Sequence, residues 1–513
     1  MHVLLFDDPA IWPHLLPFTF TRPVAALRCG ILTIAEKWQR HLAAPTVGYL
    51  TQPYLQVKFP VCADGVVTGS ALVINGAVCP DEVLVRQVQA LRPGQGLYCD
   101  DLLVAAHLAD ATHIAELVQD GLAEEIQVAE PVTVISRPWH LFLRNGVEIR
   151  RDFALLTKGR TSQPIDDAHT IVYGSENIFI EEGVKIRAAI LNAEDGPIYL
   201  GKNSQVHEGA IIKGPLALCE GSHINSGAKM RGDNTIGPFS KVGGEVGNSI
   251  LFGYANKGHD GYLGNSVIGE WCNLGADTNT SNLKNNYAPV KIWSHVAHCF
   301  VDTGQTFCGL MMGDHSKCGI NTMFNTGTVV GVGANIFGAG FPRTFIPSFS
   351  WGGAAGFETF KLPKVDEVAE RVMARRNLPY DLAEQKIMQE VFEATAEDRI
   401  WEKNSALTCP AHTKSISKTM NPPPMKLDAL SCLLGGVGLL AMSFLVVPGL
   451  LVVPTIVGRV GLVAVLALGA CALWWAVRRF TAVGERVAAV VGVVVGWYVL
   501  LGLINGVMLF TSI

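Results

Sequence analysis

The feature that most constrains this chain is a six-residue repeat of hydrophobic residues. Its longest run occupies the middle of the chain: Leu200, Val206, Ile212, Leu218, Ile224, Met230, Ile236 and Val242. The spacing returns in two later runs, which are Tyr262, Ile268 and Leu274, and then Met312, Cys318, Phe324, Val330 and Ile336. A period of six fits neither a helix nor a strand and is typical of a solenoid. The repeat therefore predicts a parallel β-helix over residues 178–353, with three flat faces per coil.

Two stretches interrupt the six-residue spacing. Residues 246–261 and 280–307 do not follow it and are too long to be simple corners between strands. Loops that leave a regular scaffold frequently carry functional residues. Both stretches are therefore expected to protrude from the β-helix and to contribute to a site.

The segments around the β-helix differ from it in composition. Residues 1–135 alternate short apolar runs with amphipathic stretches, which predicts an α/β domain with a mostly parallel sheet. A connector occupies residues 136–177, and apolar residues at helical spacing predict a helical segment over 354–403. A linker containing three consecutive prolines follows over 404–428.

The last segment, residues 429–513, is almost free of charged residues. Its uncharged runs, 430–458, 460–477 and 487–513, approach or exceed the length of about 18 to 20 residues that a spanning helix needs. They predict a transmembrane region of about three helices in contact with membrane lipid. Basic residues before the first run and after the second predict, by the positive-inside rule, a multi-pass inner-membrane protein with its catalytic domains in the cytoplasm.

Charge and cysteine usage exclude other classes of function. The formal net charge is −5 and no dense stretch of Lys and Arg occurs, so nucleic acid is not an expected partner. The 12 cysteines contain no CxxC pair, which argues against a zinc site. No metal site is predicted from them.

One histidine stands in a setting suited to acid–base chemistry. His259 lies in a stretch containing Gly and Lys just before the hexad spacing resumes at Tyr262. Imidazole titrates near neutral pH, so a histidine on a loop against a rigid scaffold can act as a general base. Residues 273–286, which follow, are rich in amides that suit hydroxyl-bearing ligands. The alternatives are a structural or solvated histidine and asparagines that stack within solenoid corners.

These residues together carry a resemblance to a known family. The solenoid is similar to the left-handed β-helix of hexapeptide acyltransferases, and the stretch around His259 resembles the acetyltransferase half of the bifunctional enzymes that make UDP-N-acetylglucosamine. The matching positions are Lys257, His259, Tyr262, Ile268-Gly269, Asn273-Leu274-Gly275-Ala276 and Ser281-Asn282. The resemblance implies a transferase that uses acetyl-CoA and forms a homotrimer with sites between its subunits.

The resemblance also implies a role for individual residues. His259 would be the catalytic base that deprotonates the 2-amine of glucosamine 1-phosphate, and Tyr262 and Asn273 would hold the sugar. Asn282 would help to orient the reacting groups. Ala276 would offer a backbone group to the acetyl-CoA thioester.

Recognition of the sugar phosphate departs from the family pattern. Arg231 resembles the arginine that grips this phosphate, and a guanidinium suits such an anion. A family lysine falls on Gly247 in this chain. Lys257 and Lys284 are the candidates to replace it, and the identity of the acceptor depends on that replacement.

The N-terminal domain carries a second resemblance. Residues 15–33 are similar to a variant bacterial branch of the same family, which implies a sugar nucleotidyltransferase-like domain acting on UTP. Arg22 or Arg28 would then supply a cation to the nucleotide. The aspartate that binds Mg²⁺ in ordinary members falls near Asn75, so Mg²⁺ is expected only if this domain is active. A degenerate domain used for binding or oligomerisation is the alternative.

Three hypotheses follow. The first is a membrane-anchored N-acetyltransferase that transfers acetyl from acetyl-CoA to glucosamine 1-phosphate and that is fused to a nucleotidyltransferase-like domain. The second keeps acetyl-CoA but changes the acceptor to another sugar or nucleotide sugar, with a non-catalytic N-terminal domain. The third is a non-enzymatic β-helix platform tethered to a membrane.

Overall fold

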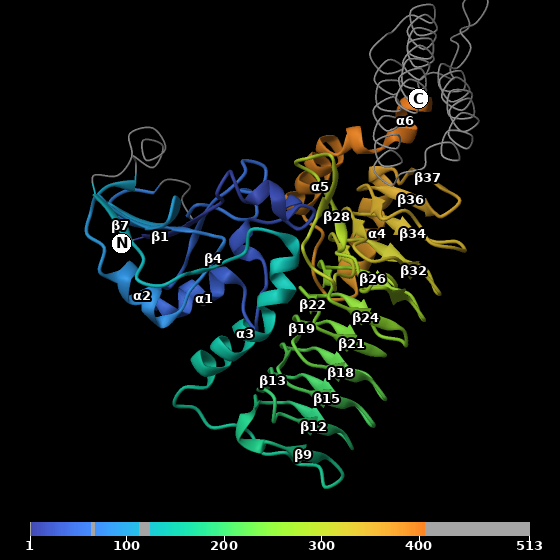
Figure 1. Ribbon diagram of the computed structural model, residues 1–513, viewed down its shortest axis with the longest axis horizontal. Helices are drawn as coiled ribbons and strands as arrows, with labels where there is room; N and C mark the ends of the chain where they lie inside the picture. The colour runs from blue at the N-terminus through green and yellow to red at the C-terminus, as the bar shows by residue number, and fades with distance from the viewer. Residues whose placement is uncertain (1, 63–66, 112–123, 406–513) are drawn as a thin grey trace, which may run out of the picture. The chain divides into compact units, whose positions relative to one another are not determined.

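The computed structural model describes residues 2–62, 67–111 and 124–405, and Figure 1 shows how their helices and strands are arranged. An α/β domain comes first, a β-helix follows it, and short helices come last. All of them lie within one compact unit, Met1–Pro410.

The N-terminal domain is built on a mixed sheet. In pairing order its strands are β2 (Gly48–Leu50), β1 (His2–Phe6), β3 (Ala71–Asn75), β6 (Leu102–Leu108), β5 (Gln95–Cys99) and β7 (Glu124–Gln127). Three of the five pairings are parallel, and β6 is antiparallel to both of its neighbours. The helices α1 (Ile34–His41) and α2 (Glu82–Gln89) begin at the capping side chains of Thr33 and Asp81. The predicted α/β domain is therefore present.

The β-helix has three faces, which we name by what covers them. The domain face, against the N-terminal domain, contains β10 (Ile178–Ile180), β13 (Ile198–Leu200), β16 (Leu216–Leu218), β19 (Asn234–Ile236), β22 (Ile250–Leu251), β25 (Val267–Ile268), β30 (Met311–Met312), β33 (Val329–Val330) and β35 (Phe345–Ile346). The helix face contains β11 (Lys185–Ile186), β14 (Gln205–Val206), β17 (His223–Ile224), β20 (Lys241–Val242), β23 (Asn256–Lys257), β26 (Asn273–Leu274), β31 (Lys317–Cys318), β34 (Asn335–Ile336), β36 (Ser350–Gly353) and β37 (Gly356–Thr359). The open face contains β9 (Ile171–Tyr173), β12 (Ile190–Asn192), β15 (Ile211–Lys213), β18 (Lys229–Arg231), β21 (Glu245–Gly247) and β24 (Tyr262–Gly264).

The predicted hexad positions point into the β-helix. The run from Leu200 to Val242 is buried in one interior core, and so is the run from Met312 to Ile336. Parallel pairing of each strand with the next coil stacks these side chains in columns. Tyr262 is the exception, because β24 buries Leu263 in the core in its place.

Residues 246–261 do not protrude, which corrects the prediction of a loop there. β22 and β23 lie within this stretch and pair with the coils on both sides. Inward residues occur at shorter intervals at the start of this stretch, where Val246 and Leu251 follow Val242, and the six-residue spacing then resumes at Lys257 and Leu263. Shortened corners therefore break the hexad while the strands stay in register.

Residues 280–307 do leave the coil, as expected, but they fold back onto the β-helix. They carry an antiparallel hairpin of β28 (Lys291–Ser294) and β29 (Cys299–Asp302), after which the chain rejoins the domain face at β30. Val290 and Ile292 are buried in the core that includes Val329. Trp293 stacks on Phe345 with ring centroids 4.3 Å apart. We call residues 281–309 the arm.

The N-terminal domain and the β-helix are joined through the domain face. The long helix α3 (Pro138–Thr157) follows a small ladder of β4 (Val78–Cys79) and β8 (Thr133–Val134) and contacts strands of this face. Phe179 and Tyr199 pack in one buried cluster with Ile31 and Leu32 of the domain. The hydroxyl of Thr235 donates to the carbonyl of Gly30 at 2.8 Å.

A buried ion cluster fixes α1 to α3. The Lys37 ammonium lies 2.8 Å from a Glu148 oxygen and 2.6 Å from an Asp152 oxygen. The second Asp152 oxygen accepts the backbone N–H groups of Ile31 and Leu32, at 2.8 and 3.0 Å. The two carboxylates raise the pKa of Lys37 above its usual value against the opposing effect of burial, so the ammonium stays charged.

Up to residue 405, where the described part of the chain ends, three α-helices follow the β-helix: α4 (Leu362–Ala374), α5 (Leu382–Ala394) and α6 (Ile400–Ser405). The break between α4 and α5 includes Pro379, where proline cannot continue a helix. Val365 and Met373 of α4 are buried with Trp271 and Phe349 of the β-helix. These contacts place α4 beside the helix face.

The predicted transmembrane helices and the membrane localisation are corrected by the structure. Over residues 2–62, 67–111 and 124–405, no helix combines the length and the apolar character that crossing a membrane requires. Residues 429–513, on which the prediction rested, lie outside the described residues.

Removing the buried ammonium at α1 is expected to destabilise the fold strongly. Lys37→Met would leave Asp152 buried without the cation that pairs with it and Glu148 with Arg151 as its remaining cation, at a cost of about 3–5 kcal/mol in the free energy of unfolding, measured by urea denaturation. The control is Lys364→Met, which removes an exposed pair with Glu367 and should cost less than about 0.5 kcal/mol. Equal losses in the two variants would contradict a structural role for the cluster.

Candidate functional site

His259 lies at the corner that joins the helix face to the open face. It follows β23 and precedes β24, and its side chain is exposed. The backbone of this corner is held by two side chains. The Lys257 ammonium binds it from inside the coil, and the Asn225 amide of the neighbouring coil donates to the Gly258 carbonyl at 2.7 Å. An exposed imidazole on a fixed corner can reach a ligand on either adjoining face.

Lys257 is the main support of this corner and is closed to substrate. Its side chain occupies an inward position, is 1% exposed, and lies in register between Val242 and the coil of Leu274. Its ammonium donates to the carbonyls of His259 and of Asp260, the latter at 2.9 Å. Burial lowers its pKa from 10.5 to about 8. The structure therefore gives Lys257 an interior position, which does not suit the predicted contact with substrate.

The open face brings three predicted site residues together. The Asn282 amide donates to the Tyr262 hydroxyl at 3.0 Å and to the Asn265 side chain at 2.7 Å. Arg231 lies two coils from Tyr262 on the same face, with its guanidinium 2.5 Å from a Glu245 oxygen. Burial raises the pKa of the Tyr262 phenol, so the hydroxyl stays protonated and available to donate.

The position at which the family has a lysine, Gly247, has free space around it. Gly247 lies between Arg231 and Gly264 on the open face, and a Cβ there would approach only the Arg231 side chain, at 3.4 Å. Lys284 does not fill this position, because its ammonium donates to the Pro289 carbonyl within the arm at 2.8 Å. Neither proposed replacement therefore stands beside Arg231.

Asn273 and Ala276 lie on the other side of the corner. The Asn273 side chain is outward on the helix face and accepts a hydrogen bond from the Asn256 amide at 2.8 Å. Ala276 follows the same strand, and its carbonyl accepts the N–H of Asn321 from the next coil at 2.8 Å. The structure thus divides the predicted residues between two faces, with His259 between them.

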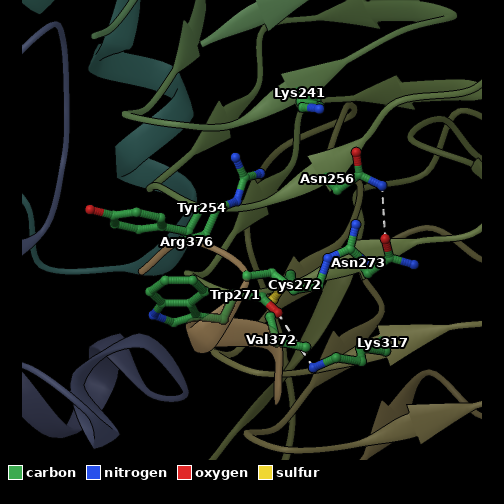
Figure 2. Close-up of a pocket in the computed structure, with 10 residues that line it drawn as sticks. Lys241, Tyr254, Asn256, Trp271, Cys272, Asn273, Lys317, Val372 and Arg376 are labelled. Atoms are coloured by element: carbon green, nitrogen blue, oxygen red, sulfur yellow. Dashed lines mark hydrogen bonds between the residues drawn. The ribbon is translucent and has the colours of Figure 1, made fainter. Parts of the chain in front are cut away.

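Four basic residues near Asn273 are absent from the predicted site. A cavity of about 450 Å³ on the helix face is lined by Asn273 and Asn256, by an aromatic pair, and by Lys241, Lys317, Arg375 and Arg376. Figure 2 shows the column on the helix face with Arg376 reaching toward it from the end of α4. The sequence repeat could have identified the two lysines of this cavity. On each coil of the helix face the residue before the inward position points outward, and these outward residues form one column. The column contains Lys241, Asn256, Asn273 and Lys317.

The two N-terminal arginines of the predicted nucleotide site are buried and bind groups of the protein itself. The Arg22 guanidinium pairs with Asp314 and lies 3.0 Å from a Glu270 oxygen, and it is buried at the junction with the β-helix. Arg28 is also buried and donates to the backbone carbonyls of Phe252 and Ile31. Both positions correct the expectation of cations open to UTP, because their charges already serve protein partners.

Asn75 lies at the carboxyl ends of the parallel strands, where α/β folds usually bind ligands. Its amide donates to Asp8 and to the Leu103 carbonyl, each at 3.1 Å. The adjacent Asp7 carboxylate accepts the Thr51 hydroxyl at 2.5 Å, and burial raises its pKa to about 6.

The carboxylates at this edge of the sheet are engaged by donors of the protein itself. Each carboxylate accepts protein donors, since Asp7 binds the Val24 N–H and Asp8 binds the Ala10 N–H, both at 2.8 Å. Across the described ranges no group of three His, Cys, Asp or Glu side chains could hold a metal ion. The carboxylates of Asp7 and Asp8 therefore stabilise the local backbone.

Comparison with known proteins supports a resemblance to sugar nucleotidyltransferases. Residues 3–161 match the sugar nucleotidyl transferase family. The bifunctional protein GlmU of Methanococcus aeolicus is 28% identical over 232 residues, or 44% of this chain and 49% of that protein. The bifunctional sugar-1-phosphate nucleotidylyltransferase/acetyltransferase of Sulfurisphaera tokodaii is 29% identical over 160 residues, or 31% of this chain and 37% of that protein. The chain is related to sugar transferases.

The extent of these matches is limited. The chain spans about half or less of the length of these two relatives. Among solved structures, the polySia specific acetyltransferase NeuO is 15% identical, with 38% of this chain and 85% of that chain covered and a TM-score of 0.21. A superposition of that quality supports no conclusion about function, so substrate and activity rest on the site itself.

Replacing the interior lysine is expected to change how stability depends on pH. The folded protein binds fewer protons at Lys257 than the unfolded chain between about pH 8 and pH 10.5, so this group makes the free energy of unfolding rise with pH across that window. Lys257→Met should abolish this rise in urea denaturation at stepped pH. Lys229→Met, at an exposed position on the open face, is the control and should keep the wild-type slope. An unchanged slope in Lys257→Met would contradict the interior ammonium.

Proposed function

We propose that this chain transfers the acetyl group of acetyl-CoA to the 2-amine of glucosamine 1-phosphate. The observation that carries the proposal is the exposed His259 on a corner fixed by Lys257, with the Tyr262–Asn282 pair on one side and Asn273 on the other. These are the residue types and positions of the acetyltransferase motif. The relatives that match the chain are transferases by name, which agrees with this class of reaction.

The proposed reaction is direct aminolysis of a thioester. The amine nitrogen attacks the acetyl carbonyl carbon while the His259 imidazole accepts a proton from it, the C–S bond then breaks, and the CoA sulfur leaves as a thiolate that takes up a proton. Hydroxyl and amide groups of Tyr262, Asn282 and Asn273 would hold the sugar in position for attack. Most of the rate enhancement would come from placing the two reactants together.

A homotrimer would complete this site, and the open face carries a surface suited to it. On the first strands of the open face, three isoleucines form one outward column in register with Lys229: Ile171, Ile190 and Ile211. Ile171 and Ile211 are 50% and 47% exposed, which is unusual for side chains of this size on a rigid face. This column leads along the face toward Arg231 and Tyr262, so a neighbour that covers it would lie next to the site.

Uridylyl transfer by the N-terminal domain is a second candidate activity. The match of residues 3–161 to the sugar nucleotidyl transferase family favours it. The buried arginines and the hydrogen-bonded carboxylates of Asp7 and Asp8 argue against it. Pyrophosphate release from UTP and N-acetylglucosamine 1-phosphate would detect this activity.

Another sugar or nucleotide sugar is the alternative acceptor. The observation in its favour is that Gly247 stands where the family has a lysine, while the Arg231 guanidinium is already paired with the Glu245 carboxylate. An acceptor without a free phosphate would not need either cation. A screen of amino sugars with and without phosphate would separate the two acceptors.

His259→Ala should reduce the rate of acetyl transfer by roughly 100-fold or more, because the amine loses its base. The measurement is release of free thiol by the full chain given acetyl-CoA and glucosamine 1-phosphate. His169→Ala, at an exposed histidine upstream of the first coil, is the control and should keep the wild-type rate. A wild-type protein that binds acetyl-CoA but releases no thiol with this acceptor would exclude the proposed acceptor.

Ile211→Arg should convert the expected trimer to monomers, because a charge would be buried without a partner at the contact. Light scattering coupled to size-exclusion chromatography reports the mass directly. Gln389→Arg adds the same charge at an exposed position on α5 and should leave the mass unchanged. A monomeric wild-type protein would contradict this assembly.

A further inference from the structure

The cavity on the helix face has an unusual surplus of positive charge. Lys241 and Lys317 lie on its β-helix wall, and Arg376 follows the end of α4 (Figure 2). Arg375, the C-cap residue of α4, also lines it. The chain as a whole has a net charge of −5, so four cations around one cavity are a local feature.

None of these four cations has an acidic partner among the residues that the structure describes. Other arginines of the C-terminal helices do have one, since Arg371 pairs with Glu367 and Arg399 pairs with Glu402. Clustered like charges repel one another, and an anion in the cavity would relieve that repulsion.

The position of Lys317 is fixed by the backbone. Its ammonium donates to the carbonyl of His315 at 2.9 Å and contacts the carbonyl of Trp271 at 3.5 Å. Burial lowers the pKa of this lysine, which is the effect expected of a cation that lacks a counter-charge. Tyr254 and Trp271 stack at 4.2 Å and form an adjoining wall, so the ring faces between them are occupied.

Asn273 links this cavity to the proposed acetyl transfer. The Asn256 amide donates to the Asn273 oxygen, which directs the Asn273 amide nitrogen away from Asn256. Both side chains line the cavity together with the cations. A ligand that offers hydroxyl groups to the amides and an anion to the cations would satisfy both sets.

We propose that this cavity binds the phosphate end of a phosphorylated sugar. Its cations would take the role of the lysine that the open face lacks at Gly247. The inference rests on the proposed function, because it assigns the phosphate to the same acceptor. On the open face Arg231 is paired with Glu245, whereas the cations of the helix face have no acidic partner among the described residues. Phosphate specificity therefore comes from Arg375, Arg376 and the two lysines.

The test is titration calorimetry of the full chain with glucosamine 1-phosphate, UDP-glucosamine and acetyl-CoA, each alone. The double variant Arg375→Gln/Arg376→Gln should weaken binding of the phosphorylated sugar by at least tenfold and leave acetyl-CoA binding unchanged, because two charge-assisted contacts are lost. Arg371→Gln, one turn earlier on α4, is the matched control and should bind both as wild type does.

Three outcomes would overturn the inference. Loss of acetyl-CoA binding alone would assign the cations to the phosphates of the acyl donor. Equal binding of the sugar by the wild type and the double variant would remove the cavity from phosphate recognition, and so would a wild type that binds neither phosphorylated sugar. Tight, variant-sensitive binding without thiol release would instead overturn only the proposed acetyl transfer and leave the cavity's role intact.

Discussion

The stacking of inward side chains from coil to coil is the constraint on which the rest of this structure depends. Each strand of the β-helix pairs in register with the strand one coil away, so every outward residue also falls into a column. On the domain face the column is apolar and buries against the N-terminal domain, as with Phe179 and Tyr199. On the helix face and the open face the outward columns are largely polar, and the residues of the candidate site lie on these two faces.

The lysine and arginine side chains of this protein differ in the groups that they contact, and their positions in the sequence do not reveal these contacts. Arg22 and Lys37 are enclosed with carboxylates and hold the domain to the β-helix and α1 to α3. Lys257 has only backbone carbonyls and supports a corner. Arg376 and its neighbours around the helix-face cavity have no carboxylate partner among the described residues. The same residue types therefore occur both in structural ion pairs and around an open cavity, and only the contacts tell them apart.

Much of this fold could be predicted from the sequence because one short-range rule governs it. The hexad spacing identified the interior of the β-helix from Leu200 to Val242, and only Tyr262 was assigned to the wrong side. Residues 246–261 could not be assigned, because shortened corners and an interior lysine break the pattern that marks a coil. The burial of Arg22 and the reach of Arg376 depend on contacts between distant segments, which no local spacing records.

The interior position of Lys257 has a consequence for how this protein can vary. Because Lys257 anchors the His259 carbonyl from within a coil, the height of the imidazole along the β-helix is set by the coil that carries it. Neighbouring strands lie about 4.8 Å apart, so a change in the number of coils moves the imidazole in steps of that size and never by less. Substrates of different length would thus be accommodated by changing the walls around a fixed histidine, and not by sliding the histidine toward them.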